Sequence, residues 1–322
     1  VAMGAPMLLA ISTVMGAYHA ALVPGGFAAR AATFHPTSPL SPLRTASRPL
    51  MAASAIDPAV LKDVEAGVLP KAPRTNPVSR VLVGGFFAIL STVVVTGIYP
   101  LVLTAALYGR IFDNARRRAN DFVVQWWART TMTLFGAKVT VEGVENLPPA
   151  DEAVMYVPNH CSFLDIFSLS GYLPRRFKYI SKIEILRIPL IGWAMGLAKH
   201  IAIRRTDRAS QMKTLKDAID TLKAGNSLVT FPEGTRSKTG VLGSFKKGPF
   251  TMAARAGVRL VPITIVGTHV FGTGALPIAI PRGVRIIVHP PIDAPKPKTG
   301  EDAAMEAARN AVLSALPPSM RP

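Results

Sequence analysis

A run of 29 residues without one charged side chain, bracketed by Arg80 and Arg110, constrains the fold of this 322-residue chain more than any other feature. About 20 apolar residues suffice to span the hydrocarbon core of a bilayer, so residues 81–109 are a candidate membrane segment. A buried core helix is the alternative reading. Pro100 and the glycines Gly84, Gly85 and Gly97 favour a kinked helix or a re-entrant pair. The sequence leaves open whether the segment spans the membrane or lies in one leaflet.

The residues that follow this run also have a membrane-facing composition. Three consecutive arginines, 116–118, suit an anionic headgroup layer. A second amphipathic segment comes next, with tryptophans that favour an interface; its apolar side chains are Phe122, Val123, Trp126, Trp127, Met132 and Leu134. Residues 81–136 are therefore expected to form a membrane-associated helical region.

The first 56 residues have the composition of a targeting leader. They contain no Asp or Glu, and they carry Arg30, Arg44 and Arg48 among many Ser, Thr, Ala and Pro residues, as organelle transit peptides do. Residues 7–23 resemble a signal-peptide core, and the two features together suggest bipartite import into a complex plastid. The alternative is a disordered, unprocessed tail, outside the fold in either case. We expect a disordered leader at 1–56, a linker at 57–80 and a location at a plastid or chloroplast membrane.

The formal net charge of +18 requires an anionic partner: nucleic acid, an anionic membrane surface or a phosphorylated substrate. Aromatic residues are sparse and no zinc-finger, RNP-like or basic-zipper pattern is present, so nucleic acid is the least favoured partner. Cys161 is the only cysteine, which excludes intramolecular disulfides. Its thiol is either a nucleophile or, as we prefer, a small apolar filler behind a turn.

From residue 137 onward, short apolar strands alternate with helices. The strand candidates are 138–141, 153–157, 178–180, 201–203, 227–231, 260–266 and 284–288. The clearest helix covers 209–224 and precedes Gly225, where a left-handed residue is expected. Thr299-Gly300-Glu301-Asp302 resembles a capping box that opens a final helix to about Leu316. The alternation predicts an α/β domain at 137–322, with a largely parallel central sheet flanked by helices.

An imidazole and a carboxylate follow the second strand candidate, in the stretch Asn159-His160-Cys161-Ser162-Phe163-Leu164-Asp165. Ser162 is a plausible N-cap for the next helix. With His160 in the turn and Asp165 in the first helical turn, one side chain can fold back onto the other. A histidine whose Nδ1–H is held by a carboxylate presents Nε2 as a base. The alternative is that His160 merely caps a turn.

A second polar motif, Phe231-Pro232-Glu233-Gly234-Thr235-Arg236-Ser237, closes a later strand. Ligands of open α/β sheets bind beyond the carboxyl ends of strands. Arg236 offers a planar fork for phosphate, Thr235 a hydroxyl and Gly234 close backbone approach. Glu233 is expected to hold the arginine or to accept a substrate hydroxyl. The alternative is a surface turn with a Glu–Arg pair.

No nucleophile elbow, Walker loop or dinucleotide fingerprint is present. The nucleophile is therefore expected to belong to the substrate. A base that activates a substrate hydroxyl beside a bound phosphate fits the transfer of an acyl group to a phosphorylated alcohol.

These motifs resemble those of the glycerolipid acyltransferase superfamily, over about residues 81–292. The stretches 159–165 and 231–237 look like its first and third motifs, Val261-Pro262-Ile263 like its fourth, and Ile201-Ala202-Ile203-Arg204-Arg205 occupies the place of the second. The closest resemblance is to 1-acyl-sn-glycerol-3-phosphate acyltransferases. The family has Asp or Asn before the arginine of the second motif, whereas this chain has Arg204; the basic pair resembles the plastidial branch.

The resemblance implies an enzyme that acylates the sn-2 hydroxyl of 1-acyl-sn-glycerol 3-phosphate, with His160 as general base and Asp165 orienting it. It implies that Pro262 shapes the acyl channel and that the substrate is bound by Lys182, Arg205, Glu233, Gly234, Thr235 and Arg236. Acyl-ACP or acyl-CoA is the implied co-substrate and membrane lipid the implied partner, with no metal or bound cofactor.

Two other functions remain open at this point. In the first, the chain is an acyltransferase for a different acceptor, such as glycerol 3-phosphate or a lysophospholipid. In the second, it is a catalytically silent membrane protein that binds lipid phosphate. A nucleic-acid-binding role rests on charge alone. Donor chain length, the choice between ACP and CoA, and oligomeric state are not encoded in these motifs.

Overall fold

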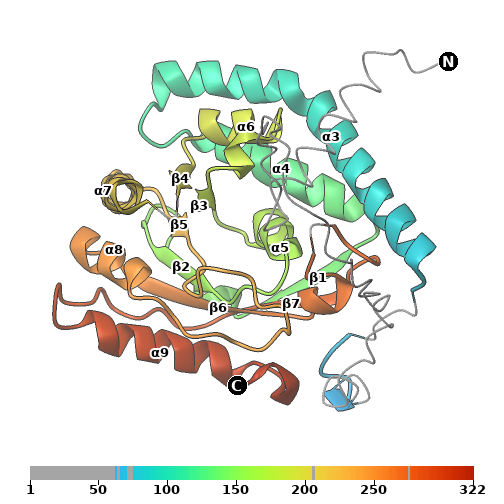
Figure 1. Ribbon diagram of the computed structural model, residues 1–322. Helices are drawn as coiled ribbons and strands as arrows, with labels where there is room; N and C mark the ends of the chain where they lie inside the picture. The colour runs from blue at the N-terminus through green and yellow to red at the C-terminus, as the bar shows by residue number, and fades with distance from the viewer. Residues whose placement is uncertain (1–61, 64–65, 71–74, 205–206, 275) are drawn as a thin grey trace, which may run out of the picture.

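A mostly parallel sheet of seven strands forms the centre of the computed structural model, which describes residues 62–63, 66–70, 75–204, 207–274 and 276–322 (Figure 1). The strands are β1 (Lys138–Glu142), β2 (Met155–Pro158), β3 (Lys178–Lys182), β4 (Ile201–Ile203), β5 (Leu228–Val229), β6 (Leu260–Val266) and β7 (Arg282–Val288). Their spatial order is β1-β7-β6-β2-β5-β3-β4, and each neighbouring pair is parallel except β6 and β7. The prediction of a largely parallel α/β sheet is confirmed, with strand ends shifted by at most two residues. The predicted leader at 1–56 and Arg205 lie outside the described residues.

Helices cover both faces of this sheet (Figure 1). They are α3 (Pro77–Phe112), α4 (Arg118–Leu134), α5 (Leu164–Tyr172), α6 (Ile191–Leu197), α7 (Arg208–Lys223), α8 (Gly248–Ala256) and α9 (Glu301–Ser314), with 3₁₀ turns at η1 (Val144–Asn146), η2 (Ile185–Arg187), η3 (Thr268–Phe271) and η4 (Pro318–Met320). Successive side chains of a strand point to opposite faces. Tyr156 of β2 therefore packs in the core beneath α3, α4 and α5, while Met155 and Val157 pack beneath α7, α8 and α9.

The uncharged run forms one continuous helix, α3, of 36 residues. It begins at Pro77, inside the range predicted as linker, where Asn76 and Ser79 form a capping box. The helix continues through Pro100 and is visibly bent (Figure 1), so the kinked helix is confirmed and the re-entrant pair is wrong. Within the described residues it is the one helix long and apolar enough to cross a membrane, by length and composition.

The α3 helix also takes part in the core of the α/β domain. Phe87 is fully buried, and its ring makes edge contacts with Phe135, Phe163 and Phe167 at centroid distances of 4.9 to 5.7 Å. In the most apolar stretch of 18 residues of this helix, only 39% is buried against the rest of the protein. The helix therefore packs on the domain with one side and exposes the other.

Two helix-cap predictions are wrong. The residue before α9 is Gly300, which has no side-chain oxygen, so no capping box forms at 299–302. The residue before α5 is Phe163 rather than Ser162. Ser162 is one position earlier, where its hydroxyl accepts a hydrogen bond from the Leu164 N–H at 3.2 Å and donates to the Gly272 carbonyl. At the end of α7, Gly225 has the expected left-handed conformation, with φ of 82°.

Candidate active site at the carboxyl edge of the sheet

The topology brings the polar motifs to one edge of the sheet. Strands β6, β2, β5, β3 and β4 are neighbours and run parallel. Their carboxyl ends therefore lie along the same edge, where ligands of such sheets bind. The residues that follow these ends include Thr268 after β6, His160 after β2, the 231–237 loop after β5 and Arg204 after β4, while Lys182 ends β3.

His160 and Asp165 form the pair that their spacing predicts. His160 Nδ1 lies 2.7 Å from Asp165 Oδ2. The carboxylate can only accept, so Nδ1 carries the hydrogen and, in the neutral ring, Nε2 carries the lone pair. The imidazole ring stacks on Phe231 with a centroid distance of 3.7 Å. The ring is thereby fixed both in its plane and in its tautomer.

Asp165 is fully buried and its two oxygens have several donors. Oδ2 also accepts from the backbone N–H groups of Cys161 at 2.8 Å and Ser162 at 2.9 Å. Oδ1 accepts from the Thr268 hydroxyl at 2.5 Å. A buried carboxylate is costly unless such donors compensate its charge. The turn 160–162 and Thr268 therefore hold an anion in place behind the imidazole.

Thr268 is a residue that the sequence reasoning missed. It lies two residues beyond the carboxyl end of β6 and is fully buried. The same strand-end rule that selected the 231–237 loop would have selected it. Its contact with Asp165 makes it a positioning residue for the pair.

Glu233 ties the 231–237 loop to the histidine turn. Its Oε1 accepts from the backbone N–H of His160 at 2.6 Å, and Oε2 accepts from that of Gly243 at 2.8 Å. Ser237 N–H donates to the His160 carbonyl at 2.8 Å. Burial raises the pKa of Glu233, while the two backbone donors oppose that shift. The carboxylate thus fixes backbone positions around the imidazole.

Arg236 lies in the same loop, and its Nη1 donates to the Gly274 carbonyl at 2.7 Å. Burial lowers the pKa of the guanidinium, and the nearby Asp165 carboxylate opposes the shift. Gly234 has φ of 75°, and a Cβ there would lie 2.8 Å from Lys246 Nζ. The Lys246 side chain therefore packs directly over Gly234. The loop contributes one positive charge, from Arg236, and Lys246 brings a second from outside the loop.

The remaining predicted site residues occupy separate places. Thr235 is exposed in the same loop. Lys182 ends β3 and lies 3.4 Å from Glu184, with both side chains partly exposed. Pro262 is buried in β6, in register with Val157 of β2. Cys161 is buried with a raised pKa, chiefly from burial, which fits the filler reading better than a nucleophile.

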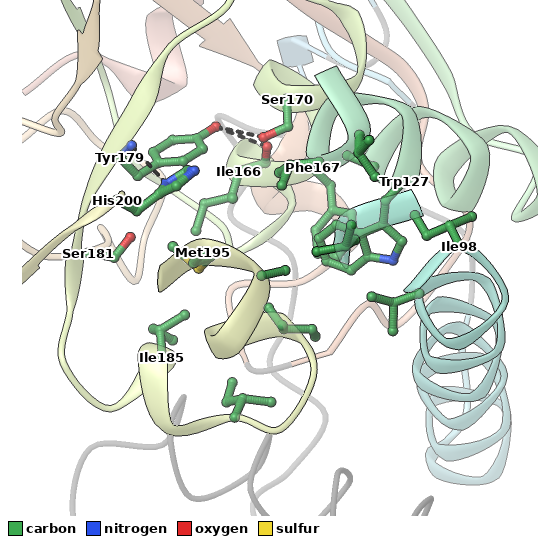
Figure 2. Close-up of a pocket in the computed structure, with 18 of the residues that line it drawn as sticks. Ile98, Trp127, Ile166, Phe167, Ser170, Tyr179, Ser181, Ile185, Met195 and His200 are labelled. Atoms are coloured by element: carbon green, nitrogen blue, oxygen red, sulfur yellow. Dashed lines mark hydrogen bonds between the residues drawn. The ribbon is translucent and has the colours of Figure 1, made fainter. Parts of the chain in front are cut away.

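An apolar cavity lies between helices α3, α4, α5 and α6 and strand β3 (Figure 2), and Phe163, three residues after His160, is among the residues that line it. The cavity volume is about 80 Å³. Phe163 and the α5 residues Ile166, Phe167 and Ser170 contribute to its wall, and the rest of the lining comes mainly from α3, α4, α6, η2, β3 and His200. Pro262 does not line it. A cavity of this composition, next to a polar centre, suits an apolar chain with a reactive polar end.

The arrangement supports general-base chemistry on a substrate that brings its own nucleophile. A histidine oriented by a buried carboxylate and a loop that carries Arg236 occur together at one sheet edge, and Phe163, three residues after the histidine, lines the apolar cavity. Among the described residues, no three His, Cys, Asp or Glu side chains gather as metal ligands. The Acyltransferase family model matches residues 138–266, which include the His160–Asp165 pair and the 231–237 loop.

Relatives of known name narrow the class. The chain is 41% identical over 244 residues to the chloroplastic 1-acyl-sn-glycerol-3-phosphate acyltransferase of Arabidopsis thaliana, covering 74% of this chain and 68% of that protein. It is 38% identical to the chloroplastic enzyme of Brassica napus, covering 80% and 74%. With the Chlamydomonas reinhardtii enzyme it shares 46% identity, covering 69% and 63%.

A solved structure agrees with these sequences. The crystal structure of the 1-acyl-sn-glycerophosphate acyltransferase PlsC from Thermotoga maritima superposes with a TM-score of 0.61 at 26% identity. The match covers 74% of this chain and 95% of that one. The chain belongs to the 1-acyl-sn-glycerol-3-phosphate acyltransferase family, in its plastidial branch, and is an acyltransferase.

Proposed function

We propose that this protein transfers an acyl group from acyl-ACP or acyl-CoA to the sn-2 hydroxyl of 1-acyl-sn-glycerol 3-phosphate and so forms phosphatidic acid. The observation that carries the proposal is the His160–Asp165 pair at 2.7 Å, enclosed by the loop that bears Arg236. The names of the relatives support the choice of acceptor.

In the proposed reaction, His160 Nε2 takes the proton of the sn-2 hydroxyl. The oxygen attacks the thioester carbonyl carbon, the new C–O bond forms and the C–S bond breaks. The imidazolium then returns its proton to the departing thiolate, so the products are an ester and a free thiol. Asp165 stabilises the imidazolium between these two transfers. The thioester is a co-substrate, and the reaction assigns no role to a metal or bound cofactor.

The acceptor phosphate is proposed to bind at the cationic loop. Arg236 provides the planar fork and Lys246 Nζ, over Gly234, provides a second charge. Lys182, at the end of β3, and Arg205, which follows β4, are proposed to add charge from the neighbouring strand ends. Thr235 is proposed to offer a hydroxyl from the same loop. Placing the phosphate there holds the substrate hydroxyl near the imidazole, which supplies much of the rate enhancement.

Acyl chains are proposed to occupy the apolar cavity. Phe163, three residues after the base, is part of its wall. This position allows a chain to enter the cavity while its thioester remains at the sheet edge. In this proposal Pro262 acts only through the packing of β6 against β2.

A panel of acceptors and donors tests the proposed function. Purified protein in detergent is offered labelled acyl-ACP or acyl-CoA with 1-acyl-sn-glycerol 3-phosphate, glycerol 3-phosphate or lysophosphatidylcholine. We expect kcat/KM for the first acceptor to exceed the others at least tenfold, because only it combines the phosphate with an apolar chain and a free sn-2 hydroxyl. Equal use of all three acceptors would contradict the acceptor assignment, and no transfer to any of them would favour the catalytically silent alternative.

The exposed side of α3 and α4 is proposed to dock on an anionic membrane surface of the plastid. Large apolar side chains are exposed there, including Leu101, Leu107, Ile111 and Phe112 of α3 and Phe122 and Trp126 of α4. Arg110 and Arg118 are exposed near the ends of the same helices. An apolar face beside cations is the combination that binds anionic lipid.

Vesicle sedimentation tests this docking. The protein is expected to bind vesicles that contain phosphatidylglycerol several-fold more tightly than purely zwitterionic vesicles, with an affinity that falls as salt rises. Ile111→Glu places a charge on the apolar face and is expected to weaken binding. Met212→Glu, an equally exposed site on α7, is the control that should leave binding unchanged. Equal binding by Ile111→Glu and the wild type would rule out this face.

A further inference from the structure

A polar group inside the apolar cavity, His200, has a defined tautomer. The residue is only 8% exposed, and its Nδ1 accepts a hydrogen bond from the Tyr179 backbone N–H at 3.0 Å. A ring nitrogen that accepts carries no proton, so in the neutral ring Nε2 bears the hydrogen. Burial, helped by the charge of Lys178, lowers the pKa of His200 to about 3. His200 Nε2 is therefore an N–H donor at neutral pH.

This donor has no acceptor among the described residues: Nε2 is buried and makes no hydrogen bond to any of them. Buried donors are normally paired, and an unpaired one costs free energy. Two hydroxyls of the cavity wall are bonded to other groups, since Tyr179 Oη donates to the Ile166 carbonyl and shares a 3.1 Å hydrogen bond with Ser170. Figure 2 shows His200 on the same side of the cavity as Tyr179, Ser170 and Ser181, across from Trp127 and Ile98.

His200 lies away from the reacting atoms. It immediately precedes β4, at the amino end of the parallel strands, whereas His160 follows the carboxyl end of β2. Its partner Tyr179 is three residues before the end of β3, which corresponds to roughly 10 Å at the rise of a strand. A chain that enters beside Phe163 therefore meets apolar wall first and the Nε2–H donor only part-way along its length.

We propose that the cavity recognises an acyl chain that carries an oxygen acceptor within its length, such as an oxo, epoxy or hydroxyl group, and that His200 Nε2–H donates to this oxygen. The inference rests on the proposed function, in which the cavity holds an acyl chain. An oxo or epoxy oxygen fits best, because it accepts without bringing a further donor that would need a partner. Recognition is specific for position, since only an oxygen at the depth of His200 reaches the donor.

Binding of a positional series of oxo-octadecanoic acids to the purified full-length protein in detergent tests this proposal. We expect one narrow range of oxo positions to bind about 3- to 10-fold more tightly than the other positions, the gain typical of one net hydrogen bond. His200→Phe should remove the positional preference. His289→Phe is the matched control, because His289 is a buried histidine outside the cavity whose Nε2 lies 2.7 Å from Thr264 Oγ1; it should keep the preference.

A flat positional series in the wild type, as expected if His200 merely holds a water molecule, would overturn the proposal. So would a preference that survives His200→Phe. Should His200→Phe fail to fold, the imidazole ¹⁵N–¹H signal of His200 in the wild type decides. It should shift with the tightest oxo acid and not with octadecanoic acid, and an unchanged signal would overturn the proposal.

Turnover measurements separate this inference from the proposed function. Failure to transfer an unsubstituted octadecanoyl chain would contradict the proposed function, while the binding series still tests the cavity. Placing the oxo group in the thioester or in the acceptor's own chain identifies which lipid occupies the cavity. A preference with either lipid supports the proposal; a preference with neither, in protein that transfers unsubstituted chains, overturns it.

Discussion

Replacing His160 by alanine is expected to lower kcat/KM for acyl transfer by about 10²- to 10⁴-fold, the usual contribution of a general base. The loss should appear mainly in kcat, because the imidazole acts on the hydroxyl as it attacks, while the phosphate and acyl-chain contacts that bind the ground state remain. The measurement is steady-state transfer of labelled acyl groups to 1-acyl-sn-glycerol 3-phosphate in detergent. Circular dichroism of the variant should match that of the wild type.

Two further variants sharpen this test. Asp165→Asn keeps the size of the side chain but replaces one of its two acceptor oxygens by an NH₂ donor. It should therefore lower kcat by a factor comparable to that of His160→Ala. Cys161→Ala is the matched control, because it removes the neighbouring thiol and leaves its backbone N–H to donate to Asp165. Its activity should stay within a few-fold of the wild type. Near-normal transfer by His160→Ala, or loss of transfer in Cys161→Ala, would assign the chemistry to another group.

The individual strands of the sheet could be predicted because each is a local apolar segment bounded by turn residues. Their order in space could not. β7 lies between β1 and β6 and runs antiparallel to β6, although all other neighbouring strands are parallel. The pairing of β1 with β7 joins segments that are distant in the chain, and no local pattern encodes it.

In the candidate site, too, some contacts could be predicted from local sequence and others depend on the order of the strands. His160 and Asp165 are five residues apart, so their contact follows from local geometry. The contacts of Thr268 with Asp165 and of Glu233 with the His160 and Gly243 N–H groups depend on which strand ends are neighbours. The donors to Glu233 are also backbone groups, which every residue type except proline has. Its positioning role therefore leaves no distinct signal in the sequence.

Replacing Lys178 by methionine is expected to lower the free energy of unfolding by about 3–5 kcal/mol, which is the usual cost of leaving one member of a buried ion pair without its partner. Lys178 opens β3 and its Nζ lies 2.8 Å from Asp121 of α4, with exposures of only 1% and 4%. Burial raises the pKa of Asp121 to about 7, and Lys178 opposes that shift. The measurement is denaturant-induced unfolding in detergent, followed by tryptophan fluorescence.

The pH dependence of that loss identifies its cause. Without Lys178, the folded-state pKa of Asp121 stays above the unfolded value of 3.8, so the folded protein binds a proton that the unfolded chain releases above that pH. The free energy of unfolding of Lys178→Met should therefore be higher near pH 4 to 5 than at neutral pH, and it should decline as the pH rises. The matched control, Lys213→Met, breaks an exposed pair with Asp217 and should cost less than about 1 kcal/mol at every pH.

The double variant Asp121→Leu/Lys178→Met removes both charges and should recover most of the loss, since apolar side chains can replace a buried pair at little cost. Failure to recover would mean that the pair also fixes the approach of α4 to β3. That approach matters for the chemistry, because Val123, Val124 and Trp127 of α4 line one wall of the cavity and Tyr179 of β3 lines another. A double variant that folds stably but loses its discrimination between acyl chains would place the function of the ion pair in the shape of the cavity.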